Sequence, residues 1–142
     1  MWPNDAQIYY AHWQSRFALA PGAESAELEM RIADDVAEAA AAGLAPSALL
    51  TLDLKGINHL GDIEVRCNGT PAVWDGYHYN HWDHGTWTDI VRYTVPPGAL
   101  RKGENSIGLF RLAPTEGFDG PLEVRKCILE LKYPKSFAPG RL

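Results

Sequence analysis

Apolar and polar residues alternate along most of this chain, and a period of two is typical of half-buried β-strands. Turn-forming pairs such as Pro21-Gly22 and Gly120-Pro121 separate the alternating segments. Because successive side chains of a strand point to opposite faces, each segment is expected to bury one face. The alternation predicts strands over residues 13–19, 25–32, 47–55, 63–67, 87–95, 106–112 and 122–133.

One segment has a different pattern. Residues 34–42 read Asp-Asp-Val-Ala-Glu-Ala-Ala-Ala-Ala, followed by Gly43. Aspartate caps a helix N-terminus, alanine has the highest helix propensity, and glycine suits the position after the last turn. This predicts one short inserted α-helix, at about residues 34–42. Many short strands with a single helix favour an all-β, antiparallel β-sandwich or jelly roll, because a parallel sheet needs a helix after almost every strand. The length of 142 residues fits one domain over 1–142.

Charge and hydropathy exclude two classes of partner. The chain has 13 Lys and Arg against 18 Asp and Glu, a net charge of −5, without the basic face that duplex binding requires. The longest run of small apolar residues, 39–45, has seven residues, whereas a membrane span needs about 20. We therefore expect no nucleic-acid partner and no membrane partner. Residues 1–5 do not resemble a signal peptide, so the expected location is cytoplasmic, or extracellular or periplasmic if a leader has been removed.

The two cysteines, Cys67 and Cys127, each lie within an apolar alternation. One pair of cysteines is not a disulfide framework, and a free cysteine commonly serves as a small core residue. We expect both thiols to be reduced and buried.

Two sequence motifs carry a family resemblance. The first is Val-Arg-Cys-Asn-Gly at 65–69, a strand that runs into a tight turn. The second, within 93–107, has the form V-P…L-x-x-G-x-N-x-I. Together they resemble the galactose-binding-domain-like β-sandwiches, jelly rolls that serve as carbohydrate-binding modules and accessory sugar-binding domains of glycoside hydrolases. Cys67 departs from this pattern, since the family usually has a larger aliphatic residue there. In the second motif, Gly103 suits a positive φ and the Asn105 side chain suits hydrogen bonding to loop backbone.

The resemblance implies a non-catalytic domain whose partners are a glycan or polysaccharide and a catalytic domain of the same parent protein. It also implies a structural calcium ion, held by loop carbonyls and carboxylates. The acidic turn at 117–120 and the pair Asp34-Asp35 are the candidate contributors to such a site.

The most unusual segment is 73–87, which we interpret as a loop. It holds three of the five Trp, two of the six Tyr and three of the five His residues. Large rings are rarely exposed in a connecting loop without a reason. A pyranose ring stacks its C–H face on Trp or Tyr, and its hydroxyls bond to Asp, Asn or His. Trp87 opens the following strand and is expected in the core. The candidate ligand-binding residues are Trp74, Asp75, Tyr77, Tyr79, Asn80, His81, Trp82 and Asp83.

Three alternatives remain open for this segment. In the first, the rings only pack on the sandwich, and the domain is a structural module that braces a catalytic domain or a subunit interface. In the second, His78, His81 and His84 bind a metal ion, although a spacing of three on a strand points neighbours to opposite faces.

The third alternative is a small metal-dependent or carboxylate-based glycan-active enzyme. Tyr79 and His81 would then be the base and acid of a lyase, or two carboxylates would face each other in a cleft. We assign no residue a catalytic role. The available acids are Asp75, Asp83, Asp89, Glu116 and Asp119.

Overall fold

A computed structural model of the chain describes residues 7–10, 17–19, 25–56, 61, 63–83, 85–112 and 122–133. Ten strands, one α-helix and one 3₁₀ helix, η2, make up the ordered elements of these ranges. Their bounds are β1 Gln7–Tyr10, β2 Phe17–Leu19, β3 Ser25–Ile32, α1 Val36–Ala41, β4 Ser47–Lys55, β5 Ile63–Cys67, β6 Thr70–Pro71, β7 Val73–Asp83, β8 Thr86–Val95, η2 Pro97–Ala99, β9 Gly103–Arg111 and β10 Leu122–Lys132.

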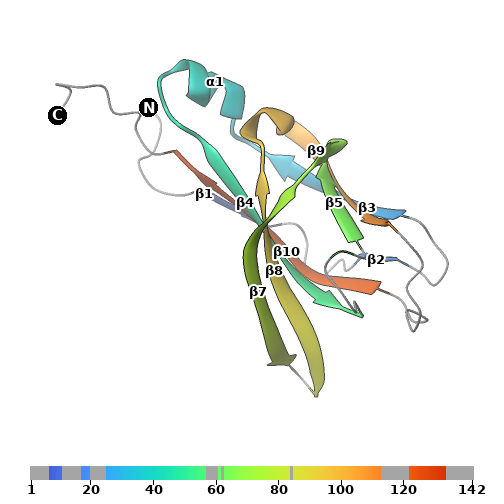
Figure 1. Cartoon of the computed structure of the whole chain (residues 1–142). Helices are drawn as coiled ribbons and strands as arrows, with labels where there is room; N and C mark the ends of the chain where they lie inside the picture. The colour runs from blue at the N-terminus through green and yellow to red at the C-terminus, as the bar shows by residue number, and fades with distance from the viewer. Residues whose placement is uncertain are drawn as a thin grey trace.

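The strands form two antiparallel sheets, which confirms the all-β sandwich (Figure 1). The larger sheet has six strands in the order β1-β10-β4-β8-β7, with β2 also paired to β10. The smaller sheet has the order β3-β9-β5-β6. Among the described residues, no helix is long and apolar enough to cross a membrane.

The core lies between the two sheets and is built from the alternating residues that the sequence indicated. Leu50, Leu52 and Leu54 of β4 are buried, and Val65 and Cys67 face them from the smaller sheet's side of the core. Both cysteines are free and buried, as expected. The predicted bounds of β3, β4 and β5 match the observed ones. The predicted strand at 13–19 is described only as β2, and the alternation did not reveal β1.

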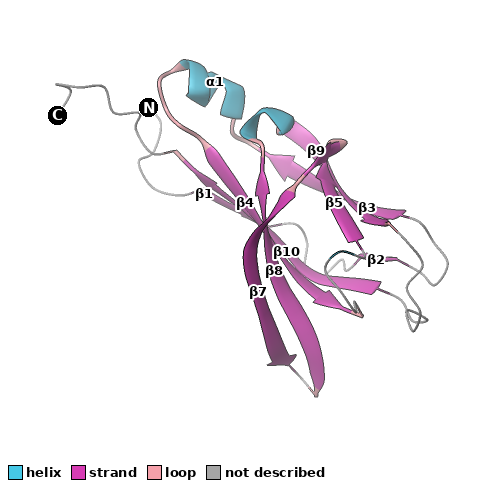
Figure 2. Cartoon of the chain, viewed as in Figure 1, coloured by secondary structure: helices cyan, strands magenta, loops and turns pink. Residues whose placement is uncertain are grey.

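The inserted helix is present but shorter than predicted. The Asp35 carboxylate accepts a hydrogen bond from the Glu38 backbone N–H at 2.9 Å, and Val36 and Ala39 are buried beneath the helix. α1 lies beside η2 at one end of the sandwich (Figure 2). Asp34 accepts a hydrogen bond from the Tyr133 hydroxyl at 2.6 Å. Both aspartates of the candidate calcium site therefore have structural roles, and the turn at 117–120 lies outside the described residues.

The turns of the two family-like motifs meet in a polar network. Asn68 and Gly69 have φ values of 50° and 83°, as a tight hairpin turn between β5 and β6 requires. The Asn68 side chain donates to the Ala99 carbonyl and to the Asn105 side chain, both at 2.8 Å. Asn105 is buried and bonds to the backbone of Arg101. The predicted loop-bonding role of Asn105 is confirmed.

A candidate binding face on the β7–β8 hairpin

The aromatic segment is a β-hairpin, so the prediction of a loop was wrong. β7 and β8 pair antiparallel from Val73 with Thr94 to Asp83 with Thr86. The hairpin extends from the sheet, and its turn points away from α1 (Figure 1). Aromatic and β-branched residues favour strands, and this preference outweighed the polar residues that had indicated a loop. The Tyr and Trp residues of 77–82 carry this strand preference, and that signal was available in the sequence.

Cross-strand partners show which side chains share a face. A residue and its antiparallel partner lie on the same face of a sheet. Val91 and Tyr93 of β8 are buried in the core, and their partners on β7 are His78 and Trp74. These residues therefore lie on the face of the six-stranded sheet that is turned toward the core, the inner face. We call this surface the inner hairpin face. Its members are Trp74, His78, Asn80 and Trp82 from β7, with Trp87 and Asp89 from β8.

Two tryptophans lie together near the turn of the hairpin. Trp82 and Trp87 are cross-strand partners whose ring centroids are 5.1 Å apart, at an interplanar angle of 68°. They are 56% and 58% exposed, so the expectation that Trp87 lies in the core was wrong. The reason is that β4 pairs with β8 only as far as Asp89. At Trp87, β8 pairs with β7 alone among the described strands, so this end of the hairpin extends beyond the rest of the sheet.

A polar cluster lies between this pair and the base of the hairpin. One oxygen of Asp89, Oδ1, is 2.7 Å from Nε2 of His78 and accepts a hydrogen bond from the Asn80 amide at 3.2 Å. Within the described part of the chain, no hydrogen bond involves Asp89 Oδ2, His78 Nδ1 or Asn80 Oδ1. These atoms remain available to bind hydroxyl groups.

At the base of the hairpin, the inner face leads into a pocket of about 320 Å³ between the edges of the two sheets. Trp74 and Tyr93 supply aromatic rings to its wall. Burial raises the pKa of the Tyr93 hydroxyl to about 12, so this group is neutral at ordinary pH. The other lining residues are Gly61, Ile63, Glu64, Val65, Ala72 and Leu112.

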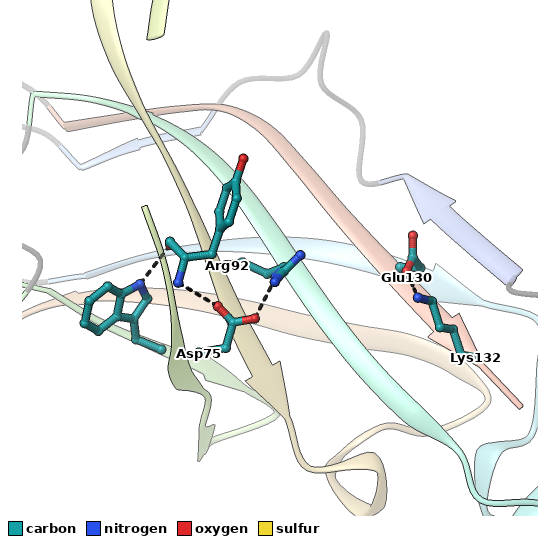
Figure 3. Close-up of polar contacts among 6 residues, drawn as sticks. Asp75, Arg92, Glu130 and Lys132 are labelled. Carbon is teal, nitrogen blue, oxygen red and sulfur yellow. Dashed lines mark hydrogen bonds and ion pairs between the residues drawn. The ribbon is translucent and has the colours of Figure 1, made fainter. Parts of the chain in front are cut away.

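The opposite, outer face of the hairpin holds a separate cluster around Arg92. The Arg92 Nε donates to Asp75 Oδ2 at 2.6 Å, and its guanidinium lies 4.9 Å from the centroid of the Tyr77 ring (Figure 3). Asp75 also accepts from the Tyr77 backbone N–H at 2.9 Å. Burial alone would raise the pKa of the Asp75 carboxyl, but the hydrogen bonds from Tyr77 and Arg92 outweigh it, and the pKa is lowered.

The structure therefore divides the predicted site residues between two faces. Trp74, Asn80 and Trp82 lie on the inner face, while Tyr79 and His81 lie on the outer face with ring centroids 6.0 Å apart. Asp75 and Tyr77 belong to the Arg92 cluster, and the Asp83 side chain lies outside the described residues. Three members of the inner face were not among the predicted ligand-binding residues: His78, Trp87 and Asp89.

The residues of the metal and enzyme alternatives are divided between the two faces of the hairpin. His78 bonds to Asp89 on the inner face, whereas His81 lies on the outer face and His84 outside the described residues. No group of three His, Cys, Asp or Glu side chains with metal-binding geometry occurs in the described ranges. The carboxylates of Asp75 and Asp89 are on opposite faces, so they do not form a facing pair. Glu116 and Asp119 lie outside the described residues.

Comparison with known proteins supports the fold. No family model matches the chain, and no curated protein is similar to it. Among solved structures, the chain is similar to a β-porphyranase of glycoside hydrolase family 86 from the human gut bacterium Bacteroides plebeius, with a TM-score of 0.57 and 16% sequence identity. The match covers 90% of this chain and 20% of that enzyme. A likeness at this identity establishes a shared β-sandwich fold.

Proposed function

We propose that this chain is a non-catalytic carbohydrate-binding module of the galactose-binding-like type, with the inner hairpin face as its glycan-binding surface. The observation that carries the proposal is the exposure of Trp82 and Trp87 side by side on that face. Exposed contiguous apolar surface is unfavourable in water, and its retention typically marks a binding site.

The chemistry of the inner hairpin face fits a sugar chain. The tryptophan rings offer stacking surfaces for the C–H faces of pyranose rings. The free atoms of the His78–Asp89–Asn80 cluster offer hydrogen bonds for hydroxyls between those surfaces. His78 and Trp82 are about 13 Å apart along the strand at about 3.3 Å per residue, and Trp74 lies farther back. A glycan of several units would contact the tryptophans at both ends.

The structural neighbour supports a role beside a catalytic domain. That neighbour is a glycoside hydrolase, and the shared fold corresponds to 20% of its chain, a share appropriate to an accessory domain. We propose that this chain likewise accompanies a catalytic domain that acts on a polysaccharide. The inner hairpin face would hold the enzyme on its substrate by adding a second contact to the same chain.

A glycan array followed by calorimetric titration tests the proposal. With the best oligosaccharide from the array, Trp82→Ala should bind at least tenfold more weakly, because loss of a large ring at a binding centre costs about 2 kcal/mol. Tyr79→Ala is the matched control, since Tyr79 is 53% exposed on the same strand but lies on the outer face. Its affinity should be unchanged. Affinity should also increase with oligosaccharide length.

The alternative is a structural module that braces a catalytic domain. The observation that favours it is the exposure of aromatic rings on the outer face as well, at Tyr77 and Tyr79. A glycan bound to the inner hairpin face would contact that face alone, whereas a protein partner can contact both faces of the hairpin. If the array detects no glycan, and Trp82→Ala and Tyr79→Ala both weaken binding to a catalytic domain, the structural module is supported and the glycan-binding proposal is wrong.

A further inference from the structure

The outer edge of β7 has a property that is independent of its side-chain faces. β7 lies at the end of the six-stranded sheet, and none of the strands that the structure describes pairs with its outer edge. The strand has 11 residues. A long exposed edge presents a row of unpaired backbone N–H and C=O groups, which is a template for pairing with another strand.

The other sheet edges are protected in recognisable ways. β6, at one end of the smaller sheet, has two residues, and one of them is Pro71, which has no N–H to donate. β3, at the other end, exposes Glu27, Glu29 and Arg31. Charged side chains on an edge oppose further pairing. β1, the terminal strand on the far side of the larger sheet, has four residues.

β7 has little comparable protection. It contains no Lys, Arg, Glu or Pro, and its two charged residues are Asp75, which is paired with Arg92, and Asp83 at its last position. A bulge interrupts its register with β8 between Trp74 and His78, where Gly76 has a φ of 94°. From His78 to Asp83 the register is regular, one residue opposite one residue. The stretch 79–83 is therefore regularly paired with β8 on one side, and none of the described strands pairs with its other side.

We propose that two copies of this chain pair antiparallel through residues 79–83 of β7, around a twofold axis at His81. Two six-stranded sheets would then become one continuous sheet. In this register His81 lies opposite the partner's His81, and Asn80 lies opposite the partner's Trp82. Tyr79 lies opposite the partner's Asp83.

Self-pairing is favoured because the segment is complementary to itself. The one acidic residue of the stretch, Asp83, lies opposite the partner's Tyr79, so no two carboxylates oppose each other, and each Asn80 amide lies opposite a Trp82 indole. Trp82 is 56% exposed in the single chain, and the pairing would cover part of its ring. Edge pairing adds a strand beside each hairpin rather than over it, so two inner hairpin faces would lie side by side, with only the edge of each Trp82 ring covered. The pairing does not rest on glycan binding.

Sedimentation velocity of the full chain over a range of concentrations tests the pairing. The parent should show a monomer–dimer equilibrium. His81→Lys should weaken the dimer at least tenfold, because two like charges would oppose each other at the axis. His81→Glu should do the same, and an equimolar mixture of the two variants should restore a dimer. Circular dichroism shows whether each variant is folded.

Cysteine cross-linking tests the register separately. Facing residues of antiparallel strands have Cα atoms about 4.5–5.5 Å apart, within the range of a disulfide. His81→Cys should form a covalent dimer under mild oxidation. Val73→Cys is the control, because Val73 is 63% exposed on the same strand but has no opposite residue of β7 in this register. The native thiols are buried and should not contribute.

A parent that is monomeric at every concentration overturns the proposal. A dimer that His81→Lys and His81→Glu leave unchanged also overturns it, as does equal cross-linking of the two cysteine variants. None of these measurements involves a glycan, so failure of this proposal and failure of the proposed function are distinguishable.

Discussion

Two consecutive hairpins of this chain use side chains in opposite ways. At the β5–β6 turn, Asn68 bonds to Asn105 and to backbone groups of Ala99 and Ser106 at 2.8–2.9 Å. Each polar group there has a partner within the fold. On the β7–β8 hairpin, Trp82 and Trp87 are more than half exposed although they are the kind of residue that usually fills a core.

The contrast separates residues that stabilise the fold from residues that are available for binding. A buried polar group that has lost its partner is costly, so the Asn68–Asn105 network contributes to stability. An exposed ring gains little from folding, because most of its surface stays in water. The two hairpins should therefore respond differently to substitution and to pH.

The largest expected difference is in the response of the interior to alkaline pH. Burial raises the pKa of the Cys67 thiol from 9.0 to about 12, and burial together with the neighbouring Cys67 also raises the pKa of Cys127. The folded state thus keeps these protons to a higher pH than the unfolded state. The contribution of Cys67 to the free energy of unfolding is complete below pH 9.0 and is lost as pH rises toward about 12. For Cys67 alone this contribution is on the order of 4 kcal/mol.

Urea denaturation between pH 8 and pH 11 measures this loss. In Cys67→Ala, the free energy of unfolding should fall less steeply with pH than in the parent, even though the variant is less stable at neutral pH. Equal slopes in the two proteins would show that Cys67 does not titrate with unfolding. The hairpin variant Trp82→Ala should keep the parent slope.

The next largest effect is expected when Asn105 of β9, which bonds to Asn68 of the β5–β6 turn, is compared with Asn80 of the β7–β8 hairpin. Asn105→Ala removes the partners of the Arg101 backbone, the Gly103 carbonyl and the Asn68 amide, and should lower the free energy of unfolding by about 3 kcal/mol. Asn80→Ala is the control and should change it by less than about 0.5 kcal/mol, since Asn80 is exposed. A similar loss of unfolding free energy in both variants would show that the exposed hairpin residue stabilises the fold as much as the buried one.

A smaller effect is expected at Gly103, the first residue of β9, which has a φ of 98°. No atom lies within 4 Å of an added Cβ, so the cost of Gly103→Ala comes from backbone strain and should be about 1 kcal/mol. Gly98→Ala is the control, because its surroundings are equally open and its φ is not positive. The difference between their urea midpoints measures the strain. Equal midpoints would mean that the turn relaxes freely.

Much of the sandwich was predictable because its signals are local. The strands β3, β4 and β5 were predicted with their observed bounds, and the α1 cap at Asp35 lies within the predicted helix. A local signal was also present in the aromatic segment, because its Tyr and Trp residues have a high strand propensity. The many polar residues of the segment favour a loop, and that prediction was wrong because the strand preference of the aromatic residues prevailed.

What the sequence determined by itself is the period of two, the turn residues and the helix cap, because each depends on neighbours a few residues apart. These local preferences are enough to require an all-β sandwich. Whether a given ring is covered depends on strands that are distant in the sequence. Trp87 and Tyr93 point to the same face of β8, yet Tyr93 is buried and Trp87 is exposed, because Trp87 lies on the part of the hairpin that extends past the last pairing with β4, at Asp89. Only the tertiary structure decided that the tryptophans share one face, since this follows from the β7–β8 register, and that none of the described strands pairs with the outer edge of β7.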